Sequence, residues 1–298
     1  MAYYTGTAND MTAVRSALVA ACVAEGWAWN SSTDMLSKGT IFVRLALVSG
    51  YLRLYGRATA TTDEMPEPQQ MGPFTGYSAS PLPALEWPVT YRIFVFAQEV
   101  YCVIQYSVDV FQWCAFGKST VSGLPGIGTW VVATAAGART AYSYGIYLTT
   151  SDGLANSNYC CPAPFWAIFQ TNDYASCVFS DLDAQGWWAA TTVSEAPVGV
   201  RALTDLIKLL PNRWNSEAVL LPIRGYKVRP SNKISLIADL EHARYTRIDN
   251  YAPAEVITIG ADRWMILPFY RKNTAQRNGG SRMDHTGTFG WAIRYEGP

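Results

Sequence analysis

The clearest pattern of hydrophobic and polar positions near the start of the sequence is helical. Between Val14 and Cys22, apolar side chains recur at spacings of three and four residues, which predicts an amphipathic helix. Asn9 or Asp10 can cap its first turn, and Gly26 is of the residue type that most often follows the last turn of a helix. We therefore expect one helix in this part of the chain.

Two stretches with strand periodicity follow the predicted helix. Residues 40–48 place branched apolar side chains at every second position, and residues 51–58 return after a Ser-Gly turn, which indicates a tight β-hairpin. Residues 91–96 and 100–106 predict a second hairpin that is apolar on both faces, as in strands covered on both sides. The N-terminal third thus predicts one helix packed on a single antiparallel sheet of about four strands.

A proline-rich segment separates the two hairpins. Residues 59–88 contain six prolines, which exclude a regular helix or strand there on sequence grounds. A loop of this length is uncommon inside a compact domain and is typical of a functional arm or lid. We interpret it as an arm that extends onto a neighbouring subunit.

The remainder of the chain is predicted to be rich in strands. Residue 120 marks the expected boundary, between an α+β domain at 1–120, with the arm at 59–88, and a β-rich domain at 121–298. The expected strands of the second part are 130–134, 141–148, 218–228, 233–240, 255–259, 263–269 and 288–295, with one short helix at 206–210. The fold class is therefore expected to be α+β and strand-dominated, with an N-terminal helix on an antiparallel sheet.

Composition narrows the function. The 298 residues are 49% hydrophobic and 13% aromatic, and 23 basic side chains balance 23 acidic ones. The apolar content excludes disorder, and zero net charge provides no long-range field for nucleic acid. No apolar stretch is long enough to span a bilayer as a helix. A surface with only 15% charged residues and many aromatics is expected to be covered by other copies or partners.

Candidate chemistry is sparse. The only histidines are His242 and His285, which removes most metal and acid–base constellations, and we expect no metal, no cofactor and no catalytic residue. Residues 117–120, GKST, end like a phosphate-binding loop, but the required earlier glycine is absent, and a polar turn after a buried strand fits better. Six cysteines are too few for a disulfide framework and indicate synthesis in a reducing cytoplasm, while the role of the Cys160-Cys161 pair stays open.

Candidate contact residues come from three places: the outward face of the first hairpin, the arm, and a polar loop at 276–282. They are Tyr51, Arg53, Tyr55, Arg57, Met65, Pro66, Pro68, Met71, Phe74, Tyr77, Leu82, Leu85, Arg277 and Arg282. Arginine and aromatic side chains together are typical of protein interfaces. An alternative set, Asp183, Trp187 and Trp188, would suit glycan contact, since sugar sites often place acids near tryptophans.

Both ends of the sequence resemble virion structural proteins of tailed bacteriophages. The similarity is carried by TGTANDMTAVRSALVAACVAEGW near the start, and by RIDNYAPAEVITIGADRWMILPFY with the closing HTGTFGWAIRYEGP. These motifs carry no assigned chemistry, so the resemblance transfers no catalytic residue. It implies a structural subunit of the tail tip or baseplate that is made in the host cytoplasm and resides in the virion.

The partners expected from this resemblance are other copies of the chain and neighbouring tail proteins, without specific nucleic-acid contact or a membrane span. A receptor- or glycan-binding tail module is one alternative, and a head–tail connector or collar component is a second. An enzyme such as a cell-wall hydrolase would need paired acids or a metal.

Overall fold

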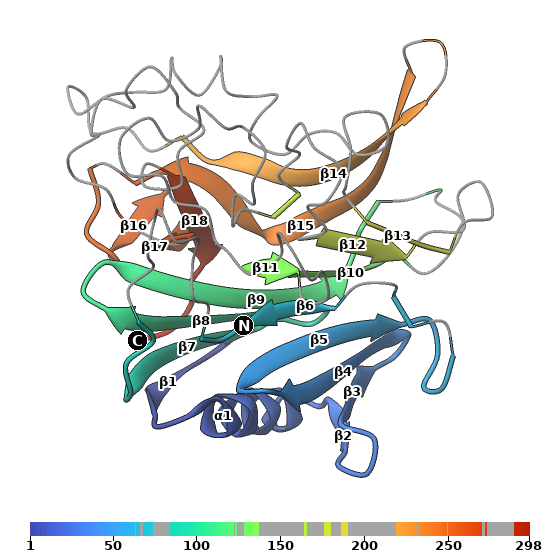
Figure 1. Cartoon of the computed structure of the whole chain (residues 1–298). Coiled ribbons are helices and arrows are strands. Elements are labelled where there is room, and N and C mark those ends of the chain that lie inside the picture. Colours follow the sequence, from blue (N-terminus) through green and yellow to red (C-terminus); the bar gives the residue numbers. More distant parts are fainter. Residues whose placement is uncertain are drawn as a thin grey trace, which may run out of the picture.

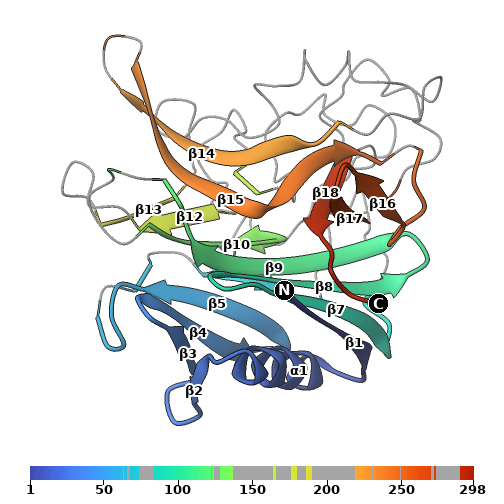
Figure 2. The same cartoon turned by 180° about the vertical axis from the view of Figure 1, so that it is seen from behind.

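The part of the chain that the computed structural model describes consists of three antiparallel sheets and one helix (Figure 1). The structure describes residues 1–62, 64–65, 68–73, 84–121, 123, 128–136, 164–165, 176–179, 186–189, 219–229, 231, 233–248, 250–269, 272 and 289–298. We call the sheets N-terminal, central and C-terminal. Figures 1 and 2 show them as layers, with the central sheet between the other two. The predicted α+β, strand-dominated fold class is confirmed.

Helix α1 (Met11–Ala24) begins and ends as its sequence predicts. The Asp10 carboxylate caps it by accepting a 2.6 Å hydrogen bond from the backbone N–H of Ala13. At its end, Gly26 has a φ of 81°, and the amides of Gly26 and Trp27 donate to carbonyls of the last turn. This is a Schellman motif, which needs a residue that tolerates the left-handed conformation.

The N-terminal sheet contains the first predicted hairpin. Its strand order is β11 (Ala135–Ala136), β6 (Gln69–Met71), β5 (Tyr51–Arg57), β4 (Ile41–Val48), β3 (Met35–Lys38) and β2 (Ala28–Asn30). Strands β4 and β5 pair from Val48 and Tyr51, across Ser49 and Gly50, which both have positive φ. Two consecutive residues of this kind form the type I′ turn that suits the twist of a hairpin.

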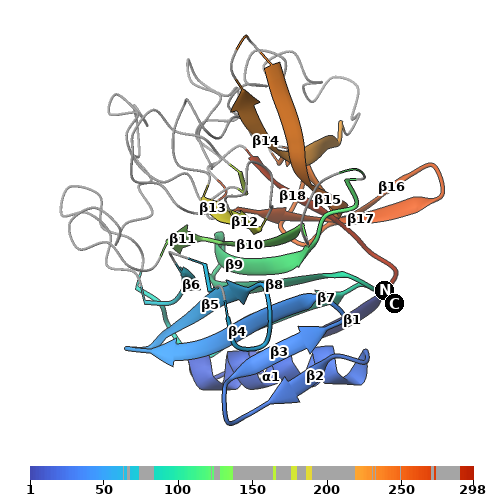
Figure 3. The same ribbon diagram turned by 90° about the vertical axis from the view of Figure 1, so that its right-hand side faces the viewer.

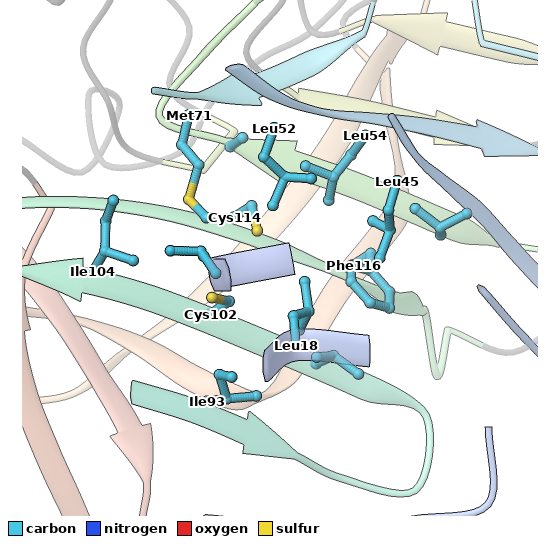
Figure 4. Packing of buried hydrophobic residues seen from close by; sticks show 14 of the residues in the cluster. Leu18, Leu45, Leu52, Leu54, Met71, Ile93, Cys102, Ile104, Cys114 and Phe116 are labelled. Carbon is cyan, nitrogen blue, oxygen red and sulfur yellow. The ribbon is translucent and has the colours of Figure 1, made fainter. Parts of the chain in front are cut away.

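The central sheet lies between the two other layers, and its middle strands are buried on both faces. Its strand order is β1 (Ala2–Ala8), β7 (Val89–Val95), β8 (Glu99–Ser107), β9 (Val110–Lys118), β10 (Thr129–Ala133), β12 (Ser176–Phe179) and β13 (Trp187–Ala189). Alternate side chains of β8 and β9, such as Cys102 and Cys114, face α1 and the N-terminal sheet, as Figure 4 shows. Tyr101 and Trp113, in between, face the C-terminal sheet. For the second hairpin, the expectation of cover on both sides is confirmed for β8 and for β7 from Ile93 onward, whereas Tyr91 and Arg92 are only half-buried.

The C-terminal sheet packs its aromatic face on the central sheet. Its strand order is β14 (Leu221–Arg229), β15 (Lys233–Arg247), β18 (Phe289–Arg294), β17 (Asp262–Pro268) and β16 (Val256–Ile259). Trp291 lies at the centre of this interface, 4.7 Å between ring centroids from Trp113 and 5.0 Å from Phe269. The two chain ends meet on the same side, as Figure 3 shows, where the terminal amine lies 3.2 Å from Glu296.

Three features differ from the sequence-based expectations. The two predicted hairpins lie in different sheets, because β7 pairs with β1 and not with the first hairpin. The segment at 59–88 contains the short strand β6, which pairs with β5. The central sheet continues across residue 120, because β10 pairs with β9. Among the described residues, no helix is both long and apolar enough to cross a membrane.

Candidate functional site

The outward side of β5 carries a row of arginine and tyrosine side chains. Every second residue of this strand, including Leu52 and Leu54, lies in the core, so the residues between them face away from it. Together with neighbours on β4 they form what we call the basic face: Phe42, Arg44, Tyr51, Arg53, Tyr55 and Arg57. The sequence predicted four of these six, and the structure brings them together on one surface.

A three-membered ion network fixes half of the basic face. Arg44 donates to both carboxylate oxygens of Glu64, at 3.0 and 2.9 Å, and Arg57 donates to Oε2 at 2.7 Å. Burial alone would raise the pKa of Glu64, but the bonds from the two arginines outweigh it and hold that pKa below its ordinary value. The Arg44 guanidinium also lies 4.0 Å from the ring centroid of Tyr55. The side chains of Arg44 and Arg57 are only 26% and 20% exposed, so they are well ordered for surface arginines.

Arg53 occupies the other half of the basic face. Its Nε donates a 3.0 Å hydrogen bond to Oε1 of Gln70 on β6, and the Gln70 side chain is buried. Across the strand pair lies the small side chain of Ala46. Within the described part of the chain, no residue accepts a hydrogen bond from Nη1 or Nη2 of Arg53. Gln70 thus orients the guanidinium, and the N–H donors of Nη1 and Nη2 have no acceptor among the described residues.

The beginning of the arm folds back onto its own subunit. Met65 and Met71 belong to the core between α1, the N-terminal sheet and the central sheet, and Pro68 is also buried. Side chains without exposed area cannot contact a neighbour, so we withdraw these three as contact residues. Leu85 packs half-buried against the same core. The remaining arm candidates, Pro66, Phe74, Tyr77 and Leu82, lie outside the described residues.

The other candidates are only partly described. Arg277, Arg282 and Asp183 lie outside the described residues, and of Trp188 only the backbone in β13 is described. Trp187 packs its ring over Gly56 of β5, where a Cβ atom would overlap it. Its half-buried ring therefore packs between the central and the N-terminal sheets. The glycan interpretation stays a prediction, because Asp183 lies outside the described residues.

The sequence did not predict a buried polar cluster that lies between the central and C-terminal sheets. Glu99, at the start of β8, is 1% exposed. One carboxylate oxygen accepts from the backbone N–H of Glu241 at 2.7 Å, and the other accepts from that of His242 at 2.9 Å and from the Tyr101 hydroxyl at 2.8 Å. Burial raises the pKa of Glu99 to about 7, although these hydrogen bonds oppose the rise.

This carboxylate closes a bulge in β15. The register between β14 and β15 shifts by three residues after Pro222, leaving residues 241–243 without partners on β14. Glu99 binds the amides of that bulge, and Nη1 of Arg244 donates to the carbonyls of Leu240, Glu241 and Ala243. We expected the strand to end at residue 240, and the bulge explains why it continues to Arg247 instead.

A second carboxylate of β15 ties the same two sheets together. Asp239 accepts from the hydroxyls of Ser119 and Thr120 at 3.0 and 2.9 Å, and from the Thr120 amide at 3.0 Å. Gly117 lies just before, where a Cβ atom would come 2.6 Å from the carbonyl oxygen of Gln98. The GKST segment therefore ends a buried strand, as the structural interpretation of its sequence predicted, and its contact with the Asp239 carboxylate was not predicted.

His242 lies in the same region, next to Glu241 in the bulge of β15. Its ring stacks on Phe96 with centroids 4.0 Å apart, and burial lowers its pKa below the ordinary value. No three acidic, histidine or cysteine side chains converge on a metal position among the residues that the structure describes. The acids of this cluster bind backbone amides and hydroxyls, so their contribution is to hold two sheets in register.

Comparison with known proteins adds no family. The chain matches no family model and no curated protein. The resemblance to phage virion proteins therefore stays a prediction from the sequence.

Proposed function

We propose that this chain is a structural subunit of a tailed-phage virion, in the tail tip or baseplate. It acts by associating with other copies and by docking neighbouring tail proteins. Its parts divide accordingly: the central and C-terminal sheets form a scaffold, and the N-terminal sheet presents the contact surface.

The basic face carries this proposal. Arginine and tyrosine are the residues that contribute most at the centres of protein interfaces, because they combine a large contact area with polar ends. The face already holds Arg44 and Arg57 in place through Glu64, so little side-chain entropy remains to be lost on binding. The carboxylates of the scaffold support the same division, since Glu99 and Asp239 are occupied by amides and hydroxyls.

Mass spectrometry of purified particles of the phage that encodes the chain tests its place in the virion. We expect the chain in stoichiometric amounts, with the major capsid protein as the internal reference. Its absence from purified particles would contradict the proposal.

Native mass spectrometry of the isolated chain tests self-association separately. A closed oligomer is expected, since virion subunits assemble by symmetric interfaces. A strict monomer at micromolar concentration would remove self-association and leave only the docking of other proteins.

A further inference from the structure

The strands of the N-terminal sheet carry basic residues and no acids. Across β2, β3, β4, β5, β6 and β11 the charged residues are Lys38, Arg44, Arg53 and Arg57, with no aspartate or glutamate. The whole chain has a net charge of zero, so the strands of this sheet are more basic than the chain as a whole. Glu64, in the segment after β5, is shared by Arg44 and Arg57 and offsets one of their charges. The basic face therefore keeps an excess of positive charge.

From the geometry of Arg53 we propose that the basic face binds a carboxylate on an acidic protein segment of a neighbouring subunit. The inference rests on the proposed function and adds the chemistry of the partner. Gln70 holds Nε of the half-buried Arg53, and among the described residues no acceptor binds Nη1 or Nη2. This pair of parallel N–H donors matches the two oxygens of a carboxylate.

The surroundings of Arg53 favour a protein over a nucleic acid. Tyr51 and Tyr55 lie two residues to either side on the same face, and aromatic flanks around an arginine are typical of the centre of a protein interface. Nucleic-acid binding gains its affinity from many phosphate contacts, but Arg44 and Arg57 are already bound to Glu64. A neutral chain also supplies no field that would attract a polyanion from a distance.

Three variants distinguish the effect of the paired N–H donors of Arg53 from the effect of its positive charge. Arg53→Gln removes both, and Arg53→Lys keeps the charge but cannot bind a carboxylate with two parallel donors. Arg92→Gln is the matched control, because Arg92 on β7 of the central sheet also donates to a glutamine oxygen, Oε1 of Gln105 at 3.1 Å. Thermal unfolding by circular dichroism is recorded for each variant, so that a change in binding is compared only among folded proteins.

Fluorescence anisotropy with a labelled oligoglutamate peptide and a labelled DNA duplex measures binding at low and at physiological ionic strength. We expect oligoglutamate to bind, Arg53→Gln to weaken it by about tenfold or more, Arg53→Lys to weaken it less, and Arg92→Gln to leave it unchanged. Tighter binding of the duplex, equal loss with Arg92→Gln, or no oligoglutamate binding overturns the inference. If the chain is present in virions but Arg53→Gln binds oligoglutamate normally, the inference fails and the proposed function stands.

Discussion

Replacing Glu99 by glutamine should remove a pH dependence of stability that this one carboxyl imposes. Glu99 is buried between the central and C-terminal sheets, and burial raises its folded-state pKa to about 7, compared with an ordinary value of 4.5. The folded protein therefore holds this proton at pH values where the unfolded chain has lost it. Stability from this group is fully present below about pH 4.5 and is lost as the pH rises through about 7.

The magnitude follows from the two pKa values. At about 1.4 kcal/mol per pKa unit, the free energy of unfolding should fall by about 3 kcal/mol across this window. Glutamine stays neutral throughout, but its single carbonyl oxygen can serve only one side of the site, so its amide group faces a backbone N–H of Glu241 or His242. That mismatch should make Glu99→Gln less stable than the natural chain by about 1–3 kcal/mol at acid pH. The difference should shrink as the pH rises.

Urea unfolding followed by tryptophan fluorescence, from about pH 5 to about pH 8, measures both quantities. Burial lowers the pKa of His242, which makes its contribution to stability rise with pH, so the natural chain and the variant must be compared at each pH. Glu86→Gln is the control, because that residue is exposed and takes no part in the hydrogen bonds of Glu99. Equal pH slopes for the natural chain and Glu99→Gln would refute the reasoning.

Three further predictions concern stability and can be measured by urea unfolding at neutral pH. Asp10→Ala should lose about 1 kcal/mol, because the cap on the Ala13 amide is removed, while Asp10→Asn should retain most of it. Met71→Ala should lose about 2–5 kcal/mol, since the side chain is fully buried; a loss below 1 kcal/mol would mean that this part of the arm is not packed as described. Gly117→Ala should lose about 1–3 kcal/mol by forcing a Cβ atom against the carbonyl of Gln98, and an unchanged midpoint would contradict that contact.

Local features of the fold could be predicted from the sequence because their signals lie within a few residues. The cap at Asp10 and the Ser49-Gly50 turn are examples, and both are confirmed. The role of Glu99 could not be predicted, because its partners lie 142 and 143 residues away and contribute only backbone amides, which any residue type supplies. Read locally, Glu99 is a turn residue after an apolar strand. The part of the basic face on β5 could be predicted as a surface. The hydrogen bond from Arg53 to Gln70 could not, because the prolines around residues 69–71 gave no strand pattern for β6.

The positive and negative charges of this chain are equal in number, but they lie in two different environments. One is the contact between the central and C-terminal sheets, and the other is the basic face, the proposed docking surface. Between the central and C-terminal sheets, Glu99 and Asp239 bind neutral amides and hydroxyls in buried or partly buried positions, which salt screens weakly. On the N-terminal sheet, Arg53 and the Arg44–Glu64–Arg57 network lie on the half-exposed basic face, where screening is stronger. Raising the salt concentration should therefore weaken docking at the basic face and leave the contact between the sheets intact.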